Sequence, residues 1–158
     1  MKVEAVIEIP LGTRNKYEVD AETGKIKLDR VLYSSVSYPC EYGFIPNTLS
    51  GDGDPLDILV LSTSATFPGC IVKARVLGYL EILDRGETDE KVISVVDTDP
   101  RWDHIHNLND LPEHTMLEIQ EFFKTYKHLQ KIEVNVGKFY GLEETKLLIQ
   151  ECKDRYEE

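Results

Sequence analysis

The sequence is poor in cysteine and histidine and has no long hydrophobic run. Its only cysteines, Cys40, Cys70 and Cys152, are widely spaced and form no CxxC pair. An odd, scattered set of this kind excludes a disulfide framework and a structural zinc site, and it indicates reduced thiols in a cytoplasmic protein. Two of the four histidines, His104 and His106, lie two apart in a loop rich in Pro and Asn, which is a weak pattern for zinc.

Membrane and export signals are also missing. The longest uncharged stretch, residues 58–72, is too short and too polar to span the roughly 30 Å of membrane hydrocarbon. The amino-terminal segment reaches Glu4 and Glu8 before any apolar signal region could form. We therefore expect a soluble, cytoplasmic protein that does not associate with membranes.

Positive charge is scarce as well. Lys and Arg number 18 against 29 Asp and Glu, so the formal net charge is -11. A surface of this sign repels nucleic acid and anionic lipid, and it would handle an anion best through bound metal cations. The sequence contains no GxxxxGK[ST], GxGxxG or GxSxG motif, which argues against a P-loop, a dinucleotide site and a serine-hydrolase elbow.

The pattern that is present consists of strands followed by helices. The length of 158 residues, with 41% hydrophobic and 30% charged residues, predicts one domain, residues 1–158. Apolar and polar residues alternate through residues 3–9 and 72–82, as in half-buried strands, and Gly78 on the apolar face predicts a bend or bulge. Shorter strand patterns occupy residues 17–19, 25–28, 57–61 and 91–96. Apolar residues at helical spacing begin near residue 113 and again near residue 143.

Strands that come first and helices that come last indicate an α+β protein that is mainly β. Several short strands and one long bent strand predict a small closed barrel with the helices packed outside. Residues 34–55 show no convincing periodicity and contain several prolines and glycines. A structureless segment of that length inside a compact domain is usually functional.

Carboxylates gather at the end of that segment, where Asp52, Asp54 and Asp57 fall within six residues. Clustered carboxylates repel one another unless a cation neutralises them, and all-oxygen ligands suit Mg²⁺, Mn²⁺ or Ca²⁺. A solvated Asp-Gly turn is the simpler alternative. Asp84 and Asp89 follow the long strand, where a charged hairpin turn is the alternative. Because a barrel rim brings strand ends together, the two groups would hold two or more divalent ions side by side.

Basic and phenolic side chains are interleaved with these carboxylates. Lys16 and Glu18 alternate on one strand and so face the same side. Further groups of this kind are Arg30, Tyr38, Tyr42, Lys91, Tyr126 and Lys127. Each alone is an ordinary surface charge or core aromatic. Together they predict a site in which metals hold one part of a multiply charged oxyanion and Lys or Arg donors hold the rest.

The order of these motifs resembles that of the family I soluble inorganic pyrophosphatases of bacteria and archaea. The acidic signature of that family, D-[SG]-D-P-x-D, corresponds to residues 52–57. The resemblance also covers the segments VIEIP (6–10), KYE (16–18), DR (29–30), YPCEYG (38–43), DRGETDEK (84–91) and YK (126–127). It implies a five-stranded OB-like barrel with two flanking α-helices. It also implies that a metal-activated water or hydroxide hydrolyses pyrophosphate to two phosphates, without a covalent phospho-enzyme.

The resemblance further implies a role for each site residue. Three or four Mg²⁺ ions, or Mn²⁺ as an alternative, would be held by Asp52, Asp57, Asp84, Asp89 and, in the outer shell, Glu8. Asp54 would accept the proton of the attacking water. The phosphates would be bound by Lys16, Arg30, Tyr42, Lys91, Tyr126 and Lys127, supported by Glu18 and Tyr38. We expect Arg30 and Lys91 to lie at the solvent-exposed rim of the barrel. We also expect Ca²⁺ to inhibit, because Ca²⁺ is larger than Mg²⁺ and acidifies bound water less.

The resemblance leaves one position unexplained and predicts an assembly. Many relatives carry an acidic residue directly after the position of Asp84, whereas this chain has Arg85, so a metal role there is in doubt. The short chain resembles the bacterial and archaeal enzymes, which are typically hexamers, and a homohexamer is therefore the favoured homo-oligomer.

Two functions of other classes stay open at this point. An OB-type barrel could capture a nucleic acid or a phosphorylated ligand without hydrolysis, with Tyr38, Tyr42 and Phe44 as stacking residues, although the net charge of -11 argues against it. A structural protein that binds Mg²⁺ or Ca²⁺ would leave the Lys and Arg residues of the predicted site without a role.

Overall fold

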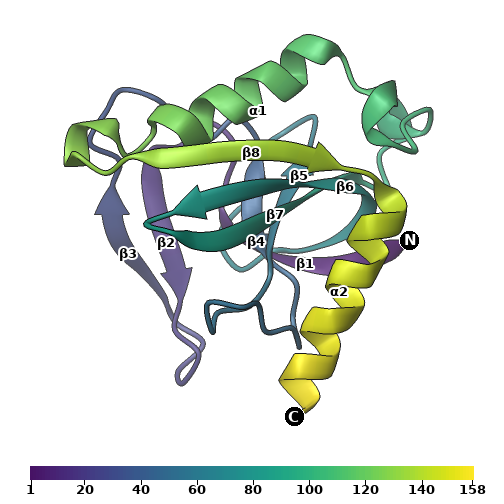
Figure 1. The fold of residues 1–158 in the computed structure, drawn as a ribbon, viewed down its shortest axis with the longest axis horizontal. Coiled ribbons are helices and arrows are strands. Elements are labelled where there is room, and N and C mark those ends of the chain that lie inside the picture. The colour runs from purple at the N-terminus through teal and green to yellow at the C-terminus, as the bar shows by residue number, and fades with distance from the viewer.

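The computed structural model describes residues 1–158 as a strand-rich body with two α-helices (Figure 1). The strands are β1 (Lys2–Ile9), β2 (Asn15–Val19), β3 (Ile26–Val31), β4 (Glu41–Phe44), β5 (Asp57–Leu61), β6 (Ile71–Asp84), β7 (Glu87–Val96) and β8 (Val134–Tyr140). The helices are α1 (Glu113–Thr125) and α2 (Leu142–Glu157), with 3₁₀ turns at Pro100–Trp102, Leu108–Asp110 and His128–Gln130. No helix is long and apolar enough to cross a membrane.

Five strands close into a barrel in the order β1, β4, β5, β7 and β6. The ring closes because the first half of β6 pairs with β1. All its neighbours are antiparallel except β5 and β7, which run parallel. Strand β8 adds to the second half of β6, and β2 and β3 form a separate hairpin beside the barrel (Figure 1). The predicted mainly β, OB-like five-stranded barrel with two flanking helices is confirmed.

The long strand β6 bends at the predicted glycine. Its pairing with β7 shifts between Val76 and Gly78, which marks a β-bulge. Residues before this shift pair with β1, and residues after it pair with β8. A Cβ at Gly78 would collide with the Tyr140 carbonyl oxygen and lie 2.5 Å from Leu108 Cδ1. Only glycine therefore lets β6 change partners at this point.

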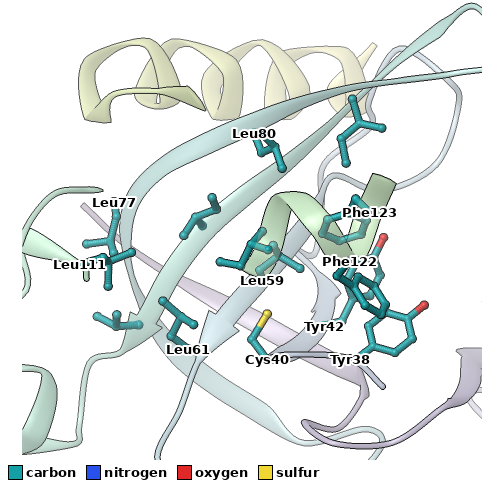
Figure 2. Close-up of a cluster of buried hydrophobic side chains, with 14 of the residues drawn as sticks. Tyr38, Cys40, Tyr42, Leu59, Leu61, Leu77, Leu80, Leu111, Phe122 and Phe123 are labelled. Carbon is teal, nitrogen blue, oxygen red and sulfur yellow. The ribbon is translucent and has the colours of Figure 1, made fainter. Parts of the chain in front are cut away.

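The apolar run of β5 fills two cores because both faces of the strand are buried. Leu59 and Leu61 lie in the cluster that includes Phe122 and Phe123 of α1 (Figure 2). The alternate residues, such as Val60, lie in the cluster that includes buried residues of α2. When a central strand is buried on both faces, its sequence is a continuous apolar run rather than an alternation of apolar and polar residues. Strand β5 thus stands between the two helices and begins at Asp57.

Three strands differ from expectation. Strand β4 lies within residues 34–55, which were expected to form a loop; β8 was not expected at all; and β7 begins at Glu87 rather than at residue 91. In β4 the buried Glu41 and Gly43 interrupt the apolar pattern. Most of β8 is only half-buried, and the first residues of β7 are exposed or half-buried hairpin residues. These segments become strands because a neighbouring strand pairs with their backbone, which side-chain alternation does not report.

We expect Gly78→Ala to lower the free energy of unfolding by about 1–3 kcal/mol, the usual range for an overpacked core. The added methyl group would meet a backbone oxygen of β8 that cannot move without breaking the β6–β8 pairing. Gly51→Ala is the control, since nothing lies within 4 Å of a Cβ at that position. Urea denaturation measures both variants, and equal stabilities would contradict the close approach at Gly78.

Candidate active site

Every side chain proposed from the sequence lines one of two adjoining cavities. The larger cavity, of about 620 Å³, is bordered by Glu8, Lys16, Glu18, Tyr38, Tyr42, Asp52, Asp54, Asp57, Asp89, Lys91, Tyr126 and Lys127. The smaller, of about 490 Å³, contains Arg30 and Asp84 and shares Asp52, Asp89 and Lys127 with the larger. The fold thus brings together the two acidic groups and the interleaved cations, which lie far apart in the sequence.

The parallel pairing of β5 with β7 creates the centre of the larger cavity. It sets Asp57, the first residue of β5, directly beside Lys91 of β7. Lys91 Nζ lies 2.6 Å from Asp57 Oδ2 and 2.9 Å from Asp89 Oδ2. The Tyr42 hydroxyl on β4 donates to Asp57 Oδ2 at 2.8 Å and accepts from Lys91 Nζ at 2.6 Å. One ammonium group therefore pairs with two carboxylates at once and leaves one negative charge uncompensated.

The expectation that Lys91 lies at a wet rim is wrong. Its exposed fraction is 3%, because β7 is flanked by β5 and β6 and the rings of Tyr42 and Phe123 lie 5.1 and 5.7 Å from Nζ. Burial opposes the charge, but the carboxylates of Asp57 and Asp89 outweigh it and hold the pKa of Lys91 well above its usual value. Removing this side chain would consequently affect the fold as well as the site. The side chain of Arg30 is one-third exposed, as expected of the rim.

The acidic segment is held in a tight turn. Asp52 Oδ1 accepts hydrogen bonds from the Ser50 hydroxyl at 2.6 Å and from the Asp54 backbone N–H at 3.0 Å. The Ser50 N–H in turn donates to the Asp54 carbonyl oxygen at 2.7 Å. Asp52 is thereby oriented by its own loop, whereas the Asp54 carboxylate takes part in no ion pair or hydrogen bond. Burial, with the charges of Asp52 and Asp57, raises the pKa of Asp54.

Three residues outside the set predicted from the sequence hold these groups in place. Ser50 orients the acidic turn, and its position two residues before Asp52 was an available signal. Asp29 pairs with Lys16 at 3.5 Å and with Arg30 at 3.3 Å, and its place beside Arg30 in the matched segment was a signal too. Arg155 of α2 donates to the carbonyl oxygen of Leu49 at 2.8 Å, next to the acidic turn. Nothing in the sequence signals this contact across more than a hundred residues.

Glu8 joins the β2–β3 hairpin to the barrel. Its Oε2 accepts a hydrogen bond from the Val19 N–H at 2.9 Å. Burial raises the pKa of Glu8 to about 7, against the hydrogen bond from Val19 and with repulsion from Asp57 and Glu18. Burial disfavours the ionised form of this carboxyl group, and a nearby cation would stabilise that form.

The smaller cavity holds an unpaired carboxylate oxygen. Asp84 ends β6, and its Oδ2 lies 2.6 Å from Nζ of Lys127, which follows α1. Asp84 Oδ1 is buried and has no hydrogen-bond partner. A buried acceptor without a partner is costly, so this oxygen is suited to bind a cation.

The donor set of the two cavities fits hard divalent ions. Carboxylates outnumber ammonium and guanidinium groups along the walls, and burial raises the pKa of Asp89 even though Lys91 opposes the shift. No three His, Cys, Asp or Glu side chains are gathered closely enough to hold a metal ion together, and Lys91 and Lys127 pair with carboxylates of the two cavities. An all-oxygen set with excess negative charge is chemistry for Mg²⁺, Mn²⁺ or Ca²⁺ rather than for zinc.

Comparison with known proteins decides the family. The sequence model of the family described as Inorganic pyrophosphatase matches residues 5–157. The chain belongs to this family. It is 54% identical to the inorganic pyrophosphatase of Geobacillus stearothermophilus and 48% identical to that of Methanosarcina mazei, in each case over 99% of this chain and 94% of the relative. The crystal structure of inorganic pyrophosphatase from Thermus thermophilus has a TM-score of 0.96 at 47% identity, covering 99% of this chain and 92% of that one.

Family membership makes the chain an enzyme, an inorganic diphosphatase that acts on pyrophosphate. The resemblance stated from the sequence motifs is confirmed along nearly the whole chain. The two other classes, a binding module without hydrolysis and a structural metal-binding protein, are set aside by the same finding.

The variant Glu8→Gln tests whether burial raises the pKa of Glu8, through the pH dependence of the melting temperature of the metal-free protein. The folded chain binds a proton at Glu8 with a pKa of about 7, against an ordinary 4.5. The stability that this proton contributes is therefore complete below pH 4.5 and is lost as the pH rises through about 7. In EDTA we expect the melting temperature of the parent chain to fall more steeply over this range than that of Glu8→Gln, whose amide does not titrate. Calorimetry at several pH values checks this, and parallel curves would show that Glu8 is not desolvated.

Proposed function

We propose that the chain acts as one catalytic domain over residues 1–158 and hydrolyses pyrophosphate to two phosphates in a Mg²⁺-dependent reaction without a covalent phospho-enzyme. The observation that carries the proposal is the pairing of carboxylates and cations along two joined cavities. Carboxylates suit divalent ions, and Lys and Arg suit phosphoryl oxygens. No Ser, His or Cys lines the larger cavity, which supports water as the nucleophile.

Five carboxylates form the proposed metal site. Those that would hold the ions are Asp52, Asp57, Asp84 and Asp89, with Glu8 in the outer shell. The proposed cofactor is Mg²⁺, at three or four ions per site as the family resemblance implies, with Mn²⁺ as an alternative. When bound, Mg²⁺ neutralises phosphate charge and lowers the pKa of a bound water. Until then Lys91 and Lys127 offset part of the repulsion among these carboxylates.

Asp54 and Asp57 have different environments and hence different proposed roles. Asp57 is bound to Lys91 and Tyr42, which suits a fixed ligand. Asp54 has no such partner, and its pKa is raised by burial and by its acidic neighbours. A free carboxylate of raised basicity at the cavity wall suits a general base. Asp54 therefore accepts the proton of the attacking water.

The remaining polar side chains bind the phosphoryl groups. They are Lys16, Arg30, Tyr42, Lys91, Tyr126 and Lys127. Glu18 lies 3.7 Å from Lys16 Nζ and so supports its orientation. The Tyr38 ring packs edge-on against that of Tyr42 at 5.4 Å and keeps the Tyr42 hydroxyl aimed at Asp57.

Phosphate release from pyrophosphate tests the function directly. We expect turnover with Mg²⁺, none in EDTA, and none with Ca²⁺ as the only divalent ion. Added to the Mg²⁺ reaction, Ca²⁺ should inhibit, because it fills oxygen sites but acidifies bound water weakly. Full turnover with Ca²⁺ alone would contradict the requirement for a metal ion that strongly acidifies its bound water.

Asn substitutions separate the roles of the two neighbouring aspartates, since an amide keeps the size and removes charge and basicity. Asp57→Asn should raise the Mg²⁺ concentration needed for activity, with partial rescue by excess metal. Asp54→Asn should lower kcat by about 10²–10⁴, the scale of a lost general base, with little rescue and with a shifted acidic limb of the pH–rate profile. Mg²⁺ titration of each variant at several pH values is the measurement. Rescue of Asp54→Asn but not of Asp57→Asn would mean that the roles are reversed.

We further propose that the chain forms a homohexamer in the cytoplasm. A groove of about 1000 Å³ between α1 and β8 shares no lining residue with the site cavities, and its walls include Leu117, Val134 and Val136. Leu117 is 51% exposed, and exposed apolar side chains within this otherwise mostly polar groove support a subunit contact at this face. The cysteines Cys40, Cys70 and Cys152 are all free, which supports a reducing compartment.

A further inference from the structure

The acidic turn, residues 50–54, is held to the rest of the protein only through its two ends. All hydrogen bonds of these residues run among themselves, so the turn is a small unit of its own. On the carboxyl side the chain continues into the buried Leu56, whose N–H donates to Thr48 Oγ1 at 3.0 Å. The position of Asp52 relative to the carboxylates of β5 and β7 therefore depends on how the two ends are anchored.

Helix α2 provides the anchor on the amino side, at Leu49. The Leu49 N–H donates to the Cys152 carbonyl oxygen at 2.9 Å, and the Leu49 carbonyl oxygen accepts from Arg155 Nη1 at 2.8 Å. Arg155 is half-buried and takes part in no ion pair, and the Leu49 carbonyl is its only oxygen acceptor. Any cation in the last turn of α2 would favour the helix dipole. The bond to Leu49 is what connects this side chain to the site.

We propose that Arg155 is a positioning residue of the metal site: it holds the Leu49 peptide against α2 and thereby sets the affinity for Mg²⁺. This inference rests on the proposed function, because the ion is that of the proposed reaction. An ion that takes ligands from the turn and from the barrel strands needs both at a fixed separation. While the turn is anchored, binding does not have to order it first. Without the anchor, the cost of ordering the turn lowers the affinity.

The charge of Arg155 has the opposite effect on the affinity. Removing a cation from a protein with a net charge of -11 strengthens its attraction for Mg²⁺. Weaker binding in a variant that lacks the guanidinium would therefore come from the lost anchor and not from the lost charge. The sign of the change separates the two causes.

Arg155→Met is the decisive variant, since methionine keeps an aliphatic stem and a high helix propensity but removes the charge and the donors. Lys146→Met is the matched control, because Lys146 is exposed on the same helix and pairs only with Glu143 of α2, at 3.2 Å. Calorimetric titration of Mg²⁺ into the metal-free proteins, without substrate, gives the dissociation constant of the first ion. Circular dichroism at the same temperature checks that each variant is folded.

The dissociation constant should rise about tenfold in Arg155→Met, the scale of a hydrogen bond from a charged donor. Arg155→Lys should lie between the parent and Arg155→Met, because its ammonium group can still donate to the Leu49 carbonyl. Lys146→Met should bind Mg²⁺ at least as tightly as the parent. An unchanged or lower dissociation constant in Arg155→Met would overturn the proposal.

Hydrogen exchange tests the same coupling in the parent protein, without any variant. Coupling between two events is reciprocal, so bound Mg²⁺ must in turn hold the Leu49 peptide against α2. Saturating Mg²⁺ should slow exchange of the Leu49 N–H by the same factor of about ten, as measured by NMR. The Ile105 N–H, which is bonded within a turn that lines neither cavity, is the reference. Exchange at Leu49 that does not respond to Mg²⁺ would overturn the coupling.

Turnover separates a failure of this inference from a failure of the proposed function. Arg155 lines neither cavity, so kcat of Arg155→Met for pyrophosphate should return to the parent value at saturating Mg²⁺. A kcat that stays low at saturating Mg²⁺ would overturn the assignment of Arg155 to metal affinity. A parent chain that binds Mg²⁺ but does not hydrolyse pyrophosphate would instead overturn the proposed function alone.

Discussion

The buried ammonium group of Lys91 is the interaction on which the rest of the site depends. It lies within 3 Å of carboxylate oxygens on Asp57 and Asp89 and is bonded to the Tyr42 hydroxyl, so it joins three barrel strands at their polar end. Without it, the carboxylates of Asp57 and Asp89, both mostly buried, would lose the cation that they share. Such uncompensated charge is far more costly inside a protein than at its surface. The parallel β5–β7 pairing, which sets Lys91 beside Asp57, is thus both a fold contact and an electrostatic one.

The carboxylates of the site nevertheless exceed what its own cations can neutralise. Raised pKa values at Glu8, Asp54 and Asp89 have burial as their largest cause, with acidic neighbours adding to it. The buried, unpaired Oδ1 of Asp84 is a further sign of the same excess. The protein therefore holds its acidic groups in an arrangement that costs stability when they ionise and that external cations would relieve. Pre-organisation of this kind favours tight binding because the ligands need not be gathered first.

Rigid elements distant in the sequence support this strained arrangement. The Leu49 peptide is bonded at both ends to α2, through its N–H to Cys152 and through its carbonyl to Arg155, and the acidic turn follows directly. On the opposite side, the bond from Val19 to Glu8 ties the β2–β3 hairpin to β1. The groups that bind and react are thereby carried on loops and strand ends, while the barrel and the helices restrict their motion.

The sequence by itself determined the chemistry of this protein and the outline of its fold. Alternation marked the long strands, helical spacing marked α1 and α2, and Gly78 marked the bulge in β6, because local side-chain pattern reports burial of one face. It did not reveal β4 or β8, whose identity depends on backbone pairing with distant strands. From the sequence, Lys91 was expected to be exposed to solvent, and the contact of Arg155 was not predicted. Burial and long-range hydrogen bonds exist only once the barrel has closed. Residue type sets what a group can do, whereas the tertiary structure decides its neighbours, and through them its charge and its role.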